Sequence, residues 1–209
     1  MQIISDELAQ RGISLDPQNE AVVKRVIHTT ADFDYAENLR FTPDAVRQGI
    51  CALQQGTSIV TDTNMAKAGI SKPSLRRLGC EAYCYMADPE IAARADRQGS
   101  TRAVAAMQYA AQAVSPLILA VGNAPTALLE IVRMMEEDAF RPALVIGVPV
   151  GFVNVEESKV LLMESCTKYG VPAIAAMGRK GGSTVAAAIC NALLYTALNT
   201  LDPEKRGWN

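Results

Sequence analysis

Val121-Gly-Asn-Ala-Pro-Thr126 joins the end of an apolar run to the start of an amphipathic one. The same kind of junction recurs at Ile146-Gly-Val-Pro-Val-Gly-Phe-Val-Asn154 and at Met177-Gly-Arg-Lys-Gly-Gly-Ser183. Strands that alternate with helices need right-handed crossovers, which give a parallel sheet covered on both faces. The sequence therefore predicts an α/β protein with three α/β/α layers and a mainly parallel sheet of about five strands.

The remaining elements follow from hydrophobic periodicity and from turn residues. A helix is expected after Asp16-Pro17, with His28 at its end, and a second one from Thr42-Pro43 to the stop at Gly56. Further helices are expected at 100–112, 124–138, 154–169 and 182–200, and strands at 58–61, 81–85, 116–121, 143–148 and 173–177. No linker or internal repeat interrupts the pattern, so residues 1–209 are predicted to form a single domain.

Composition and charge limit the classes of function that this chain could have. The 209 residues are 49% hydrophobic and only 5% aromatic, which suits one core of small aliphatic side chains. Lys and Arg number 20 against 22 Asp and Glu, so no basic field favours nucleic acid or an anionic membrane. The five cysteines lack a C-x-x-C pair and are expected to be reduced thiols. With no signal-peptide pattern and no membrane-length apolar run, the protein is expected to be soluble and cytoplasmic.

His28 is the one histidine of the chain, in the segment Arg25-Val-Ile-His-Thr-Thr-Ala-Asp-Phe-Asp-Tyr35. Because histidine alone has an unperturbed pKa between pH 5 and 8, any imidazole chemistry must take place there. A helix-end or core role is the competing interpretation. The position alone leaves both open.

The three glycine junctions predict binding of an anion. In a doubly wound sheet, ligands bind outside the carboxyl ends of the strands, where glycine lets the backbone approach and helix N-termini offer N–H groups. Arg179 and Lys180 lie inside one such loop, and Arg102 opens a helix expected at the same edge. An ordinary turn and a solvated arginine are the alternatives for each feature alone. Neither a Walker loop, a G-x-G-x-x-G strand–helix turn nor a G-x-S-x-G elbow is present, which disfavours nucleotide and serine-hydrolase chemistry.

Taken together, these segments resemble the precorrin-8X methylmutase family of cobalamin biosynthesis, also called cobalt-precorrin-8 methylmutase or precorrin isomerase. The resemblance covers almost the whole chain. Its most specific parts are Val26-Ile-His28, Phe41-Thr-Pro-Asp44, Thr61-Asp-Thr-Asn-Met65, Ser100-Thr-Arg102, Gly122-Asn-Ala-Pro-Thr-Ala127, Gly147-Val-Pro-Val-Gly-Phe-Val153, Glu157-Ser-Lys159 and Gly178-Arg-Lys-Gly-Gly-Ser183.

The resemblance implies an isomerase that moves a methyl group from C-11 to C-12 of a ring-contracted tetrapyrrole, with no cofactor and no metal site in the protein. His28 matches the histidine that protonates the ring C nitrogen. The family forms homodimers with sites at the subunit interface, so we expect a homodimer. The expected substrate-binding residues are Asp62, Thr63, Asn64, Ser100, Arg102, Gly122, Asn123, Ala124, Thr126, Arg179, Lys180, Gly181, Gly182 and Ser183.

One departure from the family pattern lies at the N-terminus, where members carry a serine and then Ile-Ile-Arg. Here the chain begins Met1-Gln-Ile-Ile-Ser5, so that Ser5 occupies the arginine's place and the earlier serine has no counterpart. This difference keeps a second hypothesis open, a non-catalytic corrinoid-binding or carrier protein that uses the same loops. A nucleotide-dependent enzyme is a third, weaker alternative.

Overall fold

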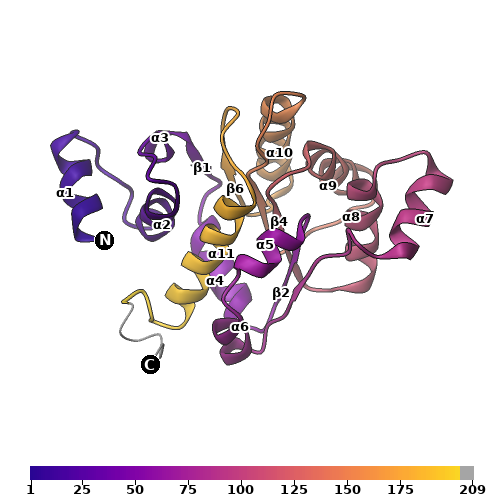
Figure 1. Ribbon diagram of the computed structural model, residues 1–209, viewed down its shortest axis with the longest axis horizontal. Coiled ribbons are helices and arrows are strands. Elements are labelled where there is room, and N and C mark those ends of the chain that lie inside the picture. Colours follow the sequence, from indigo (N-terminus) through magenta and orange to yellow (C-terminus); the bar gives the residue numbers. More distant parts are fainter. Residues whose placement is uncertain (203–209) are drawn as a thin grey trace.

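The computed structural model describes residues 1–202, and Figure 1 shows the arrangement of its elements. In chain order these are α1 (Gln2–Gln10), α2 (Glu20–Thr30), α3 (Tyr35–Asn38), β1 (Leu39–Phe41), α4 (Ala45–Gln54), β2 (Ser58–Thr61), α5 (Asn64–Gly69), α6 (Lys72–Leu78), β3 (Ala82–Tyr83), α7 (Pro89–Gln98), α8 (Arg102–Ala113), β4 (Leu117–Val121), α9 (Pro125–Glu137), β5 (Leu144–Gly147), α10 (Val155–Tyr169), β6 (Ala173–Ala176) and α11 (Ser183–Ala197).

One sheet holds the strands in the order β1-β6-β5-β4-β2-β3. All five predicted strands are present and pair in parallel, which confirms the α/β fold class. The sequence analysis missed β1, an antiparallel edge strand in which Leu39 pairs with Ala176 and Phe41 with Ile174. Three residues are too few to display a strand period, so only the pairing with β6 reveals this strand.

Several helices also differ from the expectation. The short helices α1, α3, α5, α6 and α7 were not predicted, although α7 begins with an Asp88-Pro89 signal like the one at Asp16-Pro17. The Asp16-Pro17 signal itself opens a turn, in which the Asn19 N–H donates to the Asp16 carbonyl, and α2 begins only at Glu20. An Asp-Pro pair therefore does not by itself fix where a helix begins.

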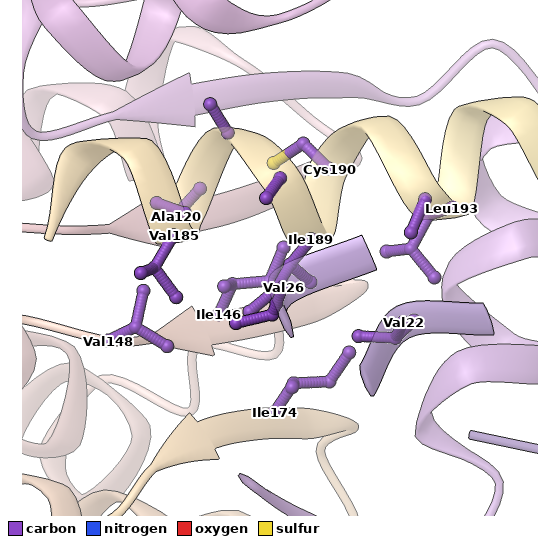
Figure 2. Packing of buried hydrophobic residues seen from close by; sticks show 14 of the residues in the cluster. Val22, Val26, Ala120, Ile146, Val148, Ile174, Val185, Ile189, Cys190 and Leu193 are labelled. Atoms are coloured by element: carbon purple, nitrogen blue, oxygen red, sulfur yellow. The ribbon is translucent and has the colours of Figure 1, made fainter. Parts of the chain in front are cut away.

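Helices cover both faces of the sheet. On one face, α2 and α11 pack on alternate strand residues. Figure 2 shows Ile189 and Leu193 of α11 near Val26 and Val22 of α2, with Ile146 and Ile174 of the sheet below them. On the other face, α7 to α10 bury Leu119 and Val145. This alternation is the period of two that a sheet buried on both sides imposes, and it fills the three layers.

Two further observations concern membrane-spanning helices and the state of the cysteines. Within residues 1–202, no helix combines the length and apolarity needed to cross a bilayer. The five cysteines are free thiols, and burial raises the pKa of Cys166 and of Cys190 to about 12. Thiols with such pKa values are poor nucleophiles at neutral pH.

Candidate active site

The loops that follow β2, β4, β5 and β6 meet at the carboxyl edge of the sheet, and Asp62 ties two of them together. Asp62 follows β2 and is 1% exposed. Its carboxylate accepts hydrogen bonds from the backbone N–H groups of Gly122 (2.8 Å), Asn123 (2.8 Å) and Ala124 (2.7 Å) in the loop after β4. Burial raises the pKa of Asp62, and these three hydrogen bonds oppose that rise.

This arrangement changes the expected role of the loop after β4. The sequence analysis assigned exposed N–H groups at this helix start to an anionic ligand, but the carboxylate of Asp62 accepts from the three N–H groups that immediately precede α9. The physical reason is that a buried carboxylate can accept from converging loop N–H groups as well as an anionic ligand does. Asp62 therefore shapes the loop, while the Asn123 side chain remains exposed at its surface.

The loops after β2 and β6 are joined by side chains. Thr63 Oγ1 lies 2.7 Å from Ser183 Oγ, and the same threonine oxygen caps α5 by accepting from the Ala66 N–H. Gly122 fits against this pair, because a Cβ at position 122 would lie 2.8 Å from the Ser183 Cα. The three loops after β2, β4 and β6 therefore form one packed unit.

The loop from Gly178 to Gly182 lies against the loop after β5. The Gly182 N–H donates to the Val148 carbonyl at 2.8 Å. A Cβ on Gly181, whose φ is +159°, would lie 2.7 Å from the Pro149 carbonyl oxygen. Beneath the loop, Lys159 of α10 is 0% exposed, and its Nζ donates to the carbonyls of Gly178 (2.7 Å) and Lys180 (2.9 Å).

The two cations of this loop are held by carboxylates. Lys180 Nζ lies 2.6 Å from a carboxylate oxygen of Asp32 and 2.6 Å from one of Asp34, which raises the pKa of Lys180 and lowers that of Asp32. Arg179 pairs with Glu156 at 2.9 Å. These pairs are exposed, so a ligand carboxylate would compete with them rather than meet free cations.

His28 lies in the last turn of α2, with an exposed side chain. Because β1 runs antiparallel to β6, the segment between α2 and β1 lies at the carboxyl end of β6, and the Met177 N–H donates to the Asn38 carbonyl at 2.8 Å. The contacts of Lys180 with Asp32 and Asp34 bind the same segment. The one histidine therefore stands at the same edge of the sheet as the four loops.

Arg25 lies one helical turn before His28 and was not among the predicted site residues. It lines a hollow of about 180 Å³ with Thr29, Met65, Thr184 and Asn191, drawn from α2, α5 and α11. Its spacing of three residues from His28 places both on neighbouring positions of one helix surface. Its guanidinium lies over the ring of Tyr195 near the end of α11, 5.2 Å from the ring centroid, so this cation packs between α2 and α11.

The other predicted residues lie at the next helix starts. Thr101 caps α8 and its hydroxyl lies 3.3 Å from that of Thr126 in α9, so Ser100 and Arg102 lie beside the loop after β4. Arg102 and Asn64 are exposed. The structure thus brings every predicted site residue to one edge of the sheet, with Arg102 at its α8 side and His28 at its α2 side.

The fold defines a class, the α/β proteins with a largely parallel sheet, which bind their ligands outside the carboxyl ends of the strands. Residues 1–196 match the family model of CbiC, precorrin-8X methylmutase. The cobalt-precorrin-8 methylmutase of Salmonella typhimurium is 49% identical over 180 residues, covering 86% of this chain and 82% of that protein. That of Leptospira interrogans is 45% identical over 177 residues, covering 83% and 80%.

A crystal structure of precorrin-8X methylmutase from Thermus thermophilus superimposes with a TM-score of 0.82 at 40% identity, covering 95% of this chain and 97% of that one. The chain belongs to the precorrin-8X methylmutase family. This confirms the resemblance and the enzyme class, a methylmutase, which is an isomerase of cobalamin biosynthesis. The relatives carry enzyme names, so the non-catalytic carrier hypothesis receives no support from them.

Proposed function

We propose that this protein moves a methyl group from C-11 to C-12 of precorrin-8X or cobalt-precorrin-8, giving hydrogenobyrinate or cobyrinate. The observation that carries the proposal is the place of His28. The one imidazole of the chain is exposed at the sheet edge where the loops after β2, β4, β5 and β6 converge, in a chain of the methylmutase family.

In the proposed mechanism, His28 protonates the ring C nitrogen of the bound macrocycle. The positive charge draws electrons from the adjacent carbon framework and eases a [1,5]-sigmatropic shift, in which the methyl bond to C-11 breaks as the bond to C-12 forms. Substrate and product are isomers, so a proton lent by His28 returns to it by the end of turnover. Histidine suits this cycle because the ordinary pKa of an imidazole is close to neutral pH, so the group can both donate a proton and take it back.

The substrate's carboxylate arms account for the cations at this edge. We assign Arg102, exposed at the start of α8, to bind one of these carboxylates. Asn64, Asn123 and Ser100 are proposed to add hydrogen bonds. We assign Asp62, Thr63, Thr126 and the loops 122–124 and 179–183 to the walls of the pocket, with Asp62 acting through the loop it shapes.

Conversion of the substrate tests the proposal directly. Purified protein is mixed with precorrin-8X, and separately with cobalt-precorrin-8, while the absorption spectrum is followed beside the Salmonella typhimurium relative as a positive control. Conversion of either compound supports the proposed function and identifies the preferred substrate. A spectrum unchanged over many turnovers of the control refutes it, and tight binding without conversion would restore the carrier hypothesis.

We further propose that the protein acts as a homodimer whose sites lie at the subunit interface. The loop after β5 supports this, because its Val150, Phe152 and Val153 are 48%, 84% and 76% exposed at the edge of the sheet that carries the predicted site residues. Such apolar exposure at one edge favours a covering partner. Sedimentation equilibrium should give twice the monomer mass, and a monomeric mass at assay concentration would contradict the proposal.

If both subunits contribute to each site, inactive variants should complement each other. Subunits with His28→Ala and subunits with Arg102→Ala, refolded together, would regain part of the wild-type rate, whereas sites built from one chain would stay inactive.

We also propose that residues 1–209 form one methylmutase domain, supported by the family match to residues 1–196. A cytoplasmic location is proposed from the five free thiols.

A further inference from the structure

We propose that Lys159 is a positioning residue: from beneath the Gly178–Gly182 loop it holds the segment that aligns the His28 end of α2 with the rest of the crevice. The inference rests on the proposed function for its kinetic test. It does not rest on that function for its structural one.

The contacts of Lys159 fix the shape of a loop that would otherwise be loose. Its Nζ donates to the Gly178 and Lys180 carbonyls, which turns both carbonyl oxygens inward. Gly178, Gly181 and Gly182 all have positive φ, a backbone region where glycine is free but costly to order. A single ammonium group that binds two carbonyls of this loop restricts its conformations and leaves its outer surface to the crevice.

The loop in turn reaches the segment that follows His28. While the Lys180 carbonyl is held by Lys159, the Lys180 side chain lies between Asp32 and Asp34. These two aspartates follow α2, whose last turn carries His28. A continuous series of contacts therefore runs from the core of α10 through the loop to the end of α2.

A stabilising contact alone does not explain a lysine at this position. Lys159 is 0% exposed, and its polar contacts are neutral carbonyls. Burial lowers the pKa of Lys159, and the more distant charge of Glu156 only partly opposes that shift. Burying an ammonium group without a bound carboxylate is costly, and an apolar side chain would pack there at lower cost. The gain is geometric, since a cation orders two carbonyls that an apolar side chain would leave unsatisfied.

The structural test uses Lys159→Met, which keeps the length of the side chain and removes its donors. Hydrogen–deuterium exchange, read by mass spectrometry, should show faster exchange at 178–183 and at 31–38, with other parts of the sheet unchanged. Lys168→Met, the same replacement at the exposed end of α10, is the matched control and should leave both segments as in the wild type. Unchanged exchange at both segments in Lys159→Met would overturn the proposal.

The kinetic test separates positioning from mere stability. At a temperature where Lys159→Met is fully folded by circular dichroism, kcat should fall about 100-fold, as expected when reacting groups are misplaced by an ångström. KM should change far less. Lys180→Gln should lower kcat through the same series of contacts, so the double variant should lose less than the product of the two effects. A wild-type kcat in folded Lys159→Met, or fully multiplicative losses, would refute the positioning role while leaving the proposed function intact.

Discussion

Thr63 Oγ1 and Ser183 Oγ, 120 residues apart in the chain, lie 2.7 Å from each other at the carboxyl edge of the sheet. The contact links the loop after β2 to the start of α11. Since Thr63 also caps α5 through the Ala66 N–H, one hydroxyl serves both the local helix and the long-range junction. The loops at this edge of the sheet are therefore held by specific polar contacts as well as by packing.

Removing this junction should cost a modest amount of stability. Ser183→Ala loses the hydroxyl pair but leaves the cap of α5, and should lower the free energy of unfolding in urea by about 1 kcal/mol. Thr63→Ala also removes the cap, which adds about another 1 kcal/mol. Equal losses from the two variants would contradict the double role of Thr63.

His28→Ala should abolish turnover without abolishing binding. Loss of a general acid typically lowers a rate by about 100- to 10,000-fold, whereas the carboxylate contacts of the ligand remain. For His28→Ala and the wild type, stopped-flow absorbance measures kcat, and an equilibrium titration with the product, followed by fluorescence, measures Kd. A variant that keeps the wild-type rate would remove His28 from the mechanism.

Gly122→Ala should damage both stability and activity. The new Cβ would meet backbone atoms, 2.8 Å from the Ser183 Cα and 2.9 Å from the Ser183 nitrogen, so the two loops must separate. We expect a loss of about 1–3 kcal/mol in unfolding free energy and a fall of about tenfold in kcat/KM.

Gly147→Ala is the control for that experiment. Its Cβ would press on side-chain atoms of Leu162 and Leu128, in the core below the crevice. Stability should fall in this variant while kcat/KM stays near the wild-type value. A similar loss of activity in both variants would show that general destabilisation, and not separation of the loops, lowers the rate.

Asp62→Asn should be strongly destabilising for a change of so few atoms. The carboxylate accepts from three N–H groups, whereas the amide offers one oxygen and turns an NH2 group toward donors. Buried unsatisfied donors should lower the free energy of unfolding by about 3 kcal/mol in urea titrations. Asp88→Asn, at the exposed cap of α7, is the control and should change little because Asn caps helices as well as Asp does. Comparable losses in both would contradict the role of Asp62.

Lys159 should give the protein a distinctive dependence of stability on pH. Burial lowers its pKa from 10.5 to about 8. Between these values the unfolded chain binds a proton that the folded protein has released, so the contribution of Lys159 to the free energy of unfolding rises with pH, by at most about 3 kcal/mol. Below pH 8 the contribution is constant, because the amine is protonated in both states.

The measurement compares urea unfolding of the wild type and Lys159→Met from pH 7 to pH 10. The difference between the two should grow in favour of the wild type above pH 8, while Lys168→Met should parallel the wild type throughout. A difference that stays flat across the range would show that Lys159 keeps its ordinary pKa in the folded protein.

The sequence by itself determined the layered α/β architecture and the enzyme family. Apolar runs that end in glycine, alternating with helical periods, specify a parallel sheet because each element must bury its apolar side locally. The same reasoning brought the glycine loops to one edge of the sheet, since the carboxyl ends of parallel strands coincide there. The role of His28 as the acid stays a prediction that only activity measurements can test.

Tertiary structure decided which residues contact one another at that edge of the sheet. The Asp62 carboxylate accepts hydrogen bonds from N–H groups of the loop after β4, and Lys180 forms ion pairs with Asp32 and Asp34. Strand β1 is defined only by its pairing with β6. These partners are about 60 to 150 residues apart or belong to segments too short to show a period. Local patterns report which face of an element is buried, whereas a long-range hydrogen bond depends on where the whole chain places its two atoms.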